Sequence, residues 1–243
     1  MYAPNQNQIR LMNRFRFIIP NFFTSMSLLS AMISLNYIAK GEYILSSWFI
    51  FLSMIFDFLD GKVARKLNAM SAFGALYDTM SDFVAFGVVP GLLIYRVSLL
   101  QINPYGAIVS VLYIFSGCYR LIRFSLRSND SSRKSSFVGL PIPIAAGFLS
   151  STVLINIRVW SQLPNEIFMA ILTLAVSFLM VSRIEYLTIN EDGKISSGAK
   201  IGFVLLFLSI IVFFKHSHIT FVVWLVGYIV YNPIRYLLVK YLK

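Results

Sequence analysis

Long apolar runs alternate with short polar segments along this chain. Each run is about as long as a helix that crosses a membrane, which needs roughly 20 mainly apolar residues. We predict spans at these approximate positions: 18–39, 43–58, 72–97, 105–124, 141–157, 166–181, 200–214 and 219–238. Pro90 and Gly91 lie inside the third span, and we expect a kink there because proline removes a helix hydrogen bond. The pattern therefore predicts an all-α, polytopic membrane helical bundle with about eight transmembrane helices, in a single membrane domain over residues 1–243.

Polar and basic segments separate these spans. Residues 1–17 precede the first span and form an N-terminal cytoplasmic or interfacial segment, either a short amphipathic helix on an anionic membrane or a disordered tail. We predict a loop through Lys62, Arg65 and Lys66 after the second span, and a serine-rich basic loop over residues 125–136. We expect no soluble domain in any of these segments.

The composition favours a membrane protein over a soluble one. Apolar residues make up 58% of the 243 residues, charged residues only 13%, and the mean hydropathy is +0.74. These values exclude an ordinary soluble domain. The single cysteine, Cys118, excludes an intrachain disulfide and a cysteine-rich metal site.

The basic residues are distributed unevenly between the two sides of the predicted bundle. The net charge is +11, and with the N-terminus inside, seventeen of the 21 lysine and arginine residues fall in inside loops, tails and helix ends. Cytoplasmic loops of membrane proteins carry such an excess. We therefore expect a multi-pass protein of the cytoplasmic membrane, surrounded by membrane lipids, with both termini facing the cytoplasm and no nucleic-acid partner.

Four of the ten acidic residues lie in two pairs near the ends of the second and third spans. Asp57 and Asp60 are three residues apart. Asp78 and Asp82 are four apart, so each pair shares one face of a helix. Four carboxylates that converge repel one another, and a bound divalent cation removes that repulsion. Hard oxygen ligands suit Mg²⁺, Mn²⁺ or Ca²⁺, so the two pairs together predict a metal site at the cytoplasmic face.

Small and basic residues lie between the two pairs. Gly61 and Gly74 allow a ligand to approach the backbone closely. Arg65 adds a positive charge beside the carboxylates. A cation held by carboxylates next to an arginine suits a diphosphate group.

The same stretch follows a spaced pattern. Every fixed position of D-x2-D-G-x2-A-R-x8-G-x3-D-x3-D is matched, by Asp57, Asp60, Gly61, Ala64, Arg65, Gly74, Asp78 and Asp82. This pattern resembles the signature of the CDP-alcohol phosphatidyltransferases. Other stretches resemble the integral-membrane phosphatidylserine synthases (CDP-diacylglycerol–serine O-phosphatidyltransferases) of that family: YRLIRFS at 119–125, FVGLPIPIAAG at 137–147, LMVSRIEY at 179–186, and Ser71 and Phe73 within the signature.

The resemblance implies an enzyme that transfers the phosphatidyl group from CDP-diacylglycerol to the hydroxyl of L-serine, giving phosphatidylserine and CMP. It implies one or two Mg²⁺ or Mn²⁺ ions, with Ca²⁺ as an inhibitory or structural occupant, and a homodimer. It also implies a catalytic six-helix core over residues 18–187, with its active site at the cytoplasmic end, followed by two further transmembrane helices in residues 188–243.

The resemblance also assigns roles to single residues. Asp82 is the expected general base on the serine hydroxyl, besides its place among the metal ligands. CDP and its diphosphate are expected to be bound by Gly61, Ala64, Arg65, Ser71 and Gly74. Serine or a phosphate is expected to be bound by Arg120, Arg123 and Ser125.

Two departures from the family pattern leave the acceptor open. The serine branch usually has serine at the position of Ala85 and asparagine at that of Ser125. One alternative is a sister enzyme that uses glycerol 3-phosphate or inositol phosphate, and another is an archaeal transferase that acts on the ether analogue of the lipid. A third is a transporter or channel with the carboxylates along an ion path. The acids lie at helix ends, which disfavours the third, because transporters carry such groups near the bilayer midplane.

Overall fold

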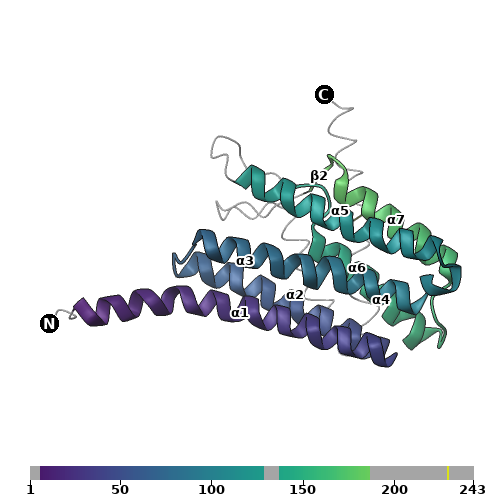
Figure 1. Cartoon of the computed structure of the whole chain (residues 1–243), viewed down its shortest axis with the longest axis horizontal. Coiled ribbons are helices and arrows are strands. Elements are labelled where there is room, and N and C mark those ends of the chain that lie inside the picture. Colours follow the sequence, from purple (N-terminus) through teal and green to yellow (C-terminus); the bar gives the residue numbers. More distant parts are fainter. Residues whose placement is uncertain (1–5, 129–136, 187–228, 230–243) are drawn as a thin grey trace, which may run out of the picture.

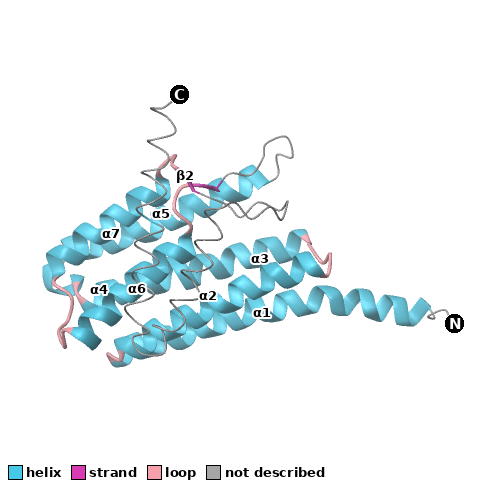
Figure 2. Ribbon diagram, turned by 180° about the vertical axis from the view of Figure 1, so that it is seen from behind, coloured by secondary structure: helices cyan, strands magenta, loops and turns pink. Residues whose placement is uncertain are grey.

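The computed structural model describes residues 6–128, 137–186 and 229, which form a bundle of helices. Its elements, in chain order, are α1 (Gln6–Lys40), α2 (Tyr43–Lys66), α3 (Ala72–Asp82), the π-helical segment η1 (Phe83–Val88), α4 (Val89–Val97), the 3₁₀ segment η2 (Leu99–Ile102), α5 (Tyr105–Ser128), β1 (Phe137–Val138), α6 (Ile142–Val159), α7 (Glu166–Val181) and β2 (Glu185–Tyr186). Figures 1 and 2 show α1 and α2 along one side of the bundle, and α5 and α7 along the other. Apart from the two-residue strands, the regular structure of the described residues is helical, which confirms the predicted helical class.

Five helices within the described residues are long and apolar enough to cross a membrane: Arg16–Lys40, Tyr43–Lys66, Ala72–Val97, Tyr105–Leu126 and Ile142–Val159. α7 is also apolar but shorter, with 16 residues. These six segments correspond to the first six predicted spans. The last two predicted spans, 200–214 and 219–238, lie outside the described residues.

The second helix is longer than its apolar run. The apolar pattern ends this span at residue 58 and places Lys62, Arg65 and Lys66 in a loop, but α2 continues to Lys66, so the predicted loop is wrong at these positions. Alanine, lysine and arginine are strong helix formers, and the helix therefore continues past the point where the apolar residues stop.

Two other polar segments are also helical where they are described. Residues 6–17 belong to α1, which favours the helical alternative for the N-terminal segment over the disordered tail. Residues 125–128, expected in a loop, form the last turn of α5, and residues 129–136 lie outside the described part. A polar segment next to an apolar run therefore indicates the edge of the membrane-spanning part, but the helix itself can continue through it.

α1 and α2 form a hairpin joined by buried hydroxyl groups. The turn between them contains Gly41, whose φ of +77° is readily adopted by glycine. The hydroxyls of Ser27 and Ser53 lie 2.8 Å apart, and those of Ser34 and Ser46 form a second pair at the same distance. Small residues let the two backbones approach closely, and hydrogen bonds between them hold helices together in lipid. The two pairs fix the register of α1 against α2.

The third span contains the π-helical segment η1 between α3 and α4. It ends two residues before Pro90, where the sequence predicts a kink. Pro90 has no N–H to donate to the carbonyl of Phe86, four residues earlier, and the hydroxyl of Tyr113 donates to that carbonyl at 2.8 Å. Tyr113 is fully buried, so the bond satisfies an acceptor that would be costly to leave unpaired. Because η1 follows Asp82 immediately, it sets how the acidic face of α3 is turned relative to α4.

α6 is largely buried in the core, whereas α5 has both a buried face and an apolar exposed face. α6 packs against α2 and α4, and its Ala145 and Leu149 are fully buried. α5 exposes apolar side chains at helical spacing, including Ile108, Phe115 and Ile122. Such a row is typical of a helix that faces lipid.

Candidate active site

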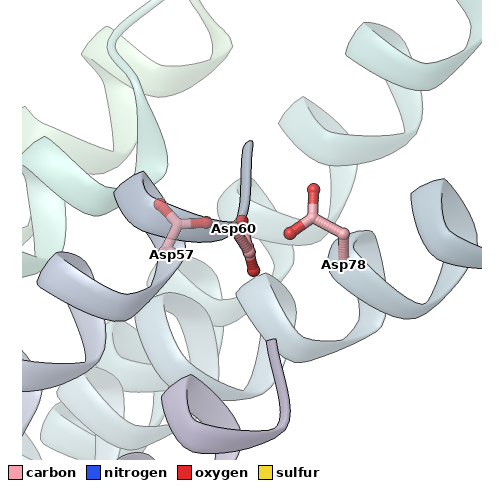
Figure 3. Close-up of side chains that lie close together, drawn as sticks. All are labelled: Asp57, Asp60 and Asp78. Atoms are coloured by element: carbon pink, nitrogen blue, oxygen red, sulfur yellow. The ribbon is translucent and has the colours of Figure 1, made fainter. Parts of the chain in front are cut away.

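Three carboxylates converge between α2 and α3. Asp57 and Asp60 lie on α2 and Asp78 on α3, and one oxygen from each lies within 4.8 Å of the other two (Figure 3). Asp60 is buried, whereas the other two are partly exposed. The three-residue spacing on α2 puts both of its carboxylates on one face, and the turn after Lys66 returns the chain so that α3 faces them.

Asp82 lies one helical turn beyond Asp78 on α3. Its carboxyl group lies next to that of Asp57. It is not one of the three residues whose oxygens meet within 4.8 Å. The structure therefore brings all four predicted aspartates together, with Asp82 at the edge of the three-oxygen cluster.

The donor set of this cluster fits a divalent cation. Asp78 Oδ1 is buried and has no hydrogen-bond partner among the described residues. A buried carboxylate oxygen without a partner is costly, and adjacent like charges add to the cost. Mg²⁺ and Mn²⁺ prefer hard oxygen ligands of this kind, so an ion here would satisfy the oxygen and offset the repulsion.

The turn between α2 and α3 is held by a capping bond at the start of α3 and by a bond from α1. Ser71 is the N-cap of α3, and its side-chain oxygen accepts a bond from the Gly74 N–H at 3.0 Å. A Cβ at Gly74 would lie 3.0 Å from Ser71 Oγ and 3.4 Å from Asn21 Oδ1, so the close packing favours glycine. Arg16 of α1 donates from Nε to the Leu67 carbonyl at 2.9 Å. Two residues predicted to bind CDP, Ser71 and Gly74, thus also shape the turn.

Arg65 lies in the last turn of α2. A Cβ on Gly61 would lie 3.7 Å from Arg65 Nη1, so the guanidinium group covers the backbone next to Asp60. Arg65 is exposed, and Ala64 is partly buried. This places a positive charge at the exposed end of the site.

The predicted acceptor residues lie on α5. Arg123 donates from Nη1 to the Val181 carbonyl at 2.8 Å and from Nη2 to the Met180 carbonyl at 3.0 Å. A cation is favourable there because the carbonyls at a helix C-terminus carry partial negative charge. Arg120, one turn earlier on α5, is buried, whereas Ser125 is exposed. Arg123 therefore holds the end of α7 against α5.

The three stretches that resemble the serine branch meet at this end of α5 and α7. The Gly139 N–H donates to the Ile184 carbonyl at 2.8 Å, and the Leu140 N–H to the Leu179 carbonyl at 3.1 Å. β1 and β2 pair antiparallel beside these bonds. Gly139 has a φ of +86°, and a Cβ there would collide with the Met180 carbonyl. We call the residues 119–125, 137–147 and 179–186 the α5–α7 corner.

Two residues that support the site lie outside the predicted set. Thr24 of α1 donates a hydrogen bond to Asp60, and Tyr113 of α5 donates to the carbonyl of Phe86 in η1. Neither lies in the acidic signature. The available signal was weak: Thr24 is a polar residue in an apolar run, and its partner is 36 residues away.

Comparison with known proteins agrees with this geometry. The family model described as CDP-alcohol phosphatidyltransferase matches residues 17–181. A CDP-diacylglycerol–serine O-phosphatidyltransferase of Helicobacter pylori is 34% identical over 224 residues, which is 91% of this chain and 92% of the relative. The Bacillus subtilis protein of the same name is 38% identical over 138 residues, covering 57% of this chain and 72% of the relative. An archaetidylserine synthase of Methanothermobacter thermautotrophicus is 32% identical over 177 residues, 72% of each chain. The chain belongs to the CDP-alcohol phosphatidyltransferase family.

Proposed function

We propose that this protein transfers the phosphatidyl group of CDP-diacylglycerol to the hydroxyl of L-serine, giving phosphatidylserine and CMP. The carboxylate cluster between α2 and α3 is the observation that carries the chemistry. The choice of serine rests on the similarity to serine transferases over nine-tenths of the chain. The same similarity disfavours glycerol 3-phosphate and inositol phosphate as acceptors.

The aspartates divide into ligands and a base. Asp57, Asp60 and Asp78 would hold a divalent cation, which supplies charge neutralisation at the diphosphate when bound. Asp82 accepts the proton of the serine hydroxyl as the serine oxygen bonds to the phosphorus that carries diacylglycerol. The bond from that phosphorus to the CMP oxygen breaks, and CMP leaves with the electron pair. The contact between Asp82 and Asp57 keeps the base next to the ligands.

Two groups of residues would hold the substrates. We assign Arg65, with Gly61, Ala64, Ser71 and Gly74, to the CDP side, because the guanidinium group lies over the backbone next to Asp60. We assign Arg120, Arg123 and Ser125 to the acceptor side or to a phosphate. The bonds from Arg123 to α7 support an indirect part for this residue, in which it shapes the α5–α7 corner.

An enzymatic assay tests the acceptor directly. Purified protein in lipid nanodiscs, given CDP-diacylglycerol and Mg²⁺ or Mn²⁺, should release CMP in the presence of L-serine. Glycerol 3-phosphate, inositol phosphate and D-serine serve as comparison acceptors. CMP release that is independent of serine, or faster with another alcohol, would contradict the proposal.

The ether-lipid analogue of CDP-diacylglycerol is a second candidate donor. The similarity to an archaetidylserine synthase supports it, because that relative shares 72% of its length with this chain. Parallel assays with ester and ether CDP-lipids separate the two. A ratio of kcat/KM values that strongly favours the ether lipid would replace the first donor by the second.

We further propose eight spans, cytoplasmic termini and an active site at the cytoplasmic end. The uneven distribution of basic residues supports this orientation, and the family resemblance supports a homodimer. In a Cys118→Ala background, cysteines at Glu42 and Lys66, the two ends of α2, should react with an impermeant reagent from opposite sides of the membrane. Only the cysteine at Lys66 should be labelled from the cytoplasm, and the reverse pattern would invert the topology.

Cross-linking in nanodiscs loaded with two chains tests the homodimer, which a persistent monomer would exclude.

A further inference from the structure

Thr24 of α1 contacts the metal site from outside the aspartate signature. Its Oγ1 lies 2.7 Å from Asp60 Oδ2, and the two side chains are 3% and 4% exposed. The same hydroxyl lies 3.2 Å from the carbonyl of Pro20 in its own helix. A hydroxyl has a single proton, and the carboxylate is both the closer and the charged acceptor, so the proton is donated to Asp60.

Thr24 also contacts the second acidic helix. The hydroxyl of Ser81 donates to the Thr24 carbonyl at 3.3 Å, and Ser81 lies between Asp78 and Asp82 on α3. Ser81 is buried, at 2% exposure. One residue of α1 is therefore bonded to both helices that supply the carboxylates.

The hydroxyl pairs between α1 and α2 set the position of Thr24. Ser27 and Ser34 each bond to a serine of α2, and Thr24 continues this row one turn towards the site. The partners of the two serines are neutral hydroxyls, so those bonds can only join the helices. The partner of Thr24 is a carboxylate of the cluster, and its bond also restricts how that carboxylate can turn.

We propose that Thr24 is a positioning residue for the cation: its hydroxyl binds Oδ2 of Asp60 and leaves the remaining lone pairs of the carboxylate to the ion. The inference rests on the proposed function in that it assigns the cluster to a metal. Hydrogen bonds of this kind orient ligating groups, and their loss typically lowers metal affinity by about 10- to 100-fold.

Direct cation binding tests the role of the hydroxyl. Mn²⁺ is titrated into the full chain in nanodiscs without substrates, and free Mn²⁺ is measured by electron paramagnetic resonance. Thr24→Val, which keeps the shape but removes the hydroxyl, should raise the Kd for Mn²⁺ about 10- to 100-fold. Thr24→Ser, which keeps the hydroxyl, should restore a Kd close to the wild-type value. Ser34→Ala is the matched control, because it removes a hydroxyl of the same row whose partner is Ser46.

A stability measurement separates positioning from a merely structural role. The Tm in chelator reports the fold, and the rise in Tm on adding Mn²⁺ reports the site. Ser34→Ala should lower only the first, whereas Thr24→Val should also shrink the second. If the valine variant does not fold, Thr24→Ala provides the same test without the branched side chain.

Two results would overturn the inference. One is a Kd for Mn²⁺ that stays at the wild-type value in both Thr24→Val and Thr24→Ala. The other is a wild-type protein that binds no Mn²⁺ at millimolar concentration. A wild type that binds Mn²⁺ normally but lacks serine-dependent CMP release would instead contradict the proposed function, and would leave the role of Thr24 supported by the binding data.

Discussion

The acidic hairpin formed by α2 and α3 (hereafter the hairpin) and the α5–α7 corner are built in opposite ways. In the hairpin, the groups that meet are side chains, placed at helical spacing within one short stretch. In the corner, three distant stretches meet, and the bonds run largely to backbone carbonyls of residues 179–184. In the proposed function, the α2–α3 hairpin carries the chemistry shared by the family, and the corner contains the residues that resemble one branch. Shared chemistry can thus be encoded locally, while the features of a branch depend on tertiary contacts.

The largest expected effect is the loss of a ligand in the hairpin. Asp78→Asn should lower serine-dependent CMP release about 100-fold or more, the usual cost of removing a group that stabilises charge in the transition state. Its Tm in chelator should be unchanged or higher, because one of several like charges is removed. Glu42→Gln, at the exposed start of α2 and without a capping bond, is the control and should retain activity. Near-normal turnover in Asp78→Asn would remove the basis for a metal site.

Asp82→Asn separates the base from the ligands. Loss of a general base typically costs about 10²- to 10⁴-fold in rate, so transfer should fall in that range. The Kd for Mn²⁺ should stay close to the wild-type value, since the three-oxygen cluster remains. Turnover and Mn²⁺ titration on the same preparation check both. If the Kd rises as much as in Asp78→Asn, then Asp82 acts as a ligand.

The hairpin could be predicted from sequence almost entirely. Helical spacing puts Asp57 and Asp60 on one face of α2 and Asp78 and Asp82 on one face of α3. The short turn between the two helices then brings the two faces together. The boundary of α2 was missed because hydropathy reports the membrane and not the hydrogen-bonded ladder. Thr24 was missed because its bond depends on the register of α1 against α2, which no local spacing encodes.

The corner could be predicted only as a resemblance. The resemblance assigns Arg120 and Arg123 to serine or a phosphate, but in the structure both terminal nitrogens of Arg123 donate to carbonyls at the end of α7. These acceptors are backbone groups, so the identities of residues 180 and 181 do not predict the contact. The positive φ of Gly139 likewise follows from the fold around it.

Substitution in the α5–α7 corner should have a smaller effect than substitution in the hairpin. It should change KM rather than kcat. Arg123→Lys keeps the charge but loses the planar fork that reaches both carbonyls. The loss of one charge-assisted bond is worth about 1.5 kcal/mol or more, so the KM for serine should rise roughly tenfold. The KM for CDP-diacylglycerol should change little. Steady-state kinetics with each substrate varied in turn measures this, with Arg96→Lys at the other end of the bundle as control. A rise confined to the CDP-lipid KM would assign the corner to the diphosphate.

The smallest effect is expected where the two regions are connected through η1. Tyr113→Phe leaves the buried carbonyl of Phe86 without its donor, which typically costs about 1–3 kcal/mol. The Tm should fall by a few degrees, and turnover should fall moderately because η1 follows Asp82. Tyr105→Phe, on the exposed start of α5, should change neither. An unchanged Tm in Tyr113→Phe would show that another donor replaces the hydroxyl.

The length of α2 determines how deep in the bilayer the reaction takes place. At about 1.5 Å per residue, Asp57 and Asp60 lie roughly 21 and 26 Å from the first residue of the helix, and the hydrocarbon layer is about 30 Å thick. In the proposed orientation, the carboxylates therefore lie near the glycerol level of the cytoplasmic leaflet. A CDP-lipid can present its phosphorus there with both acyl chains still in the hydrocarbon, so the enzyme need not extract it. In the proposed reaction, the small water-soluble acceptor instead moves from the cytoplasm to this level.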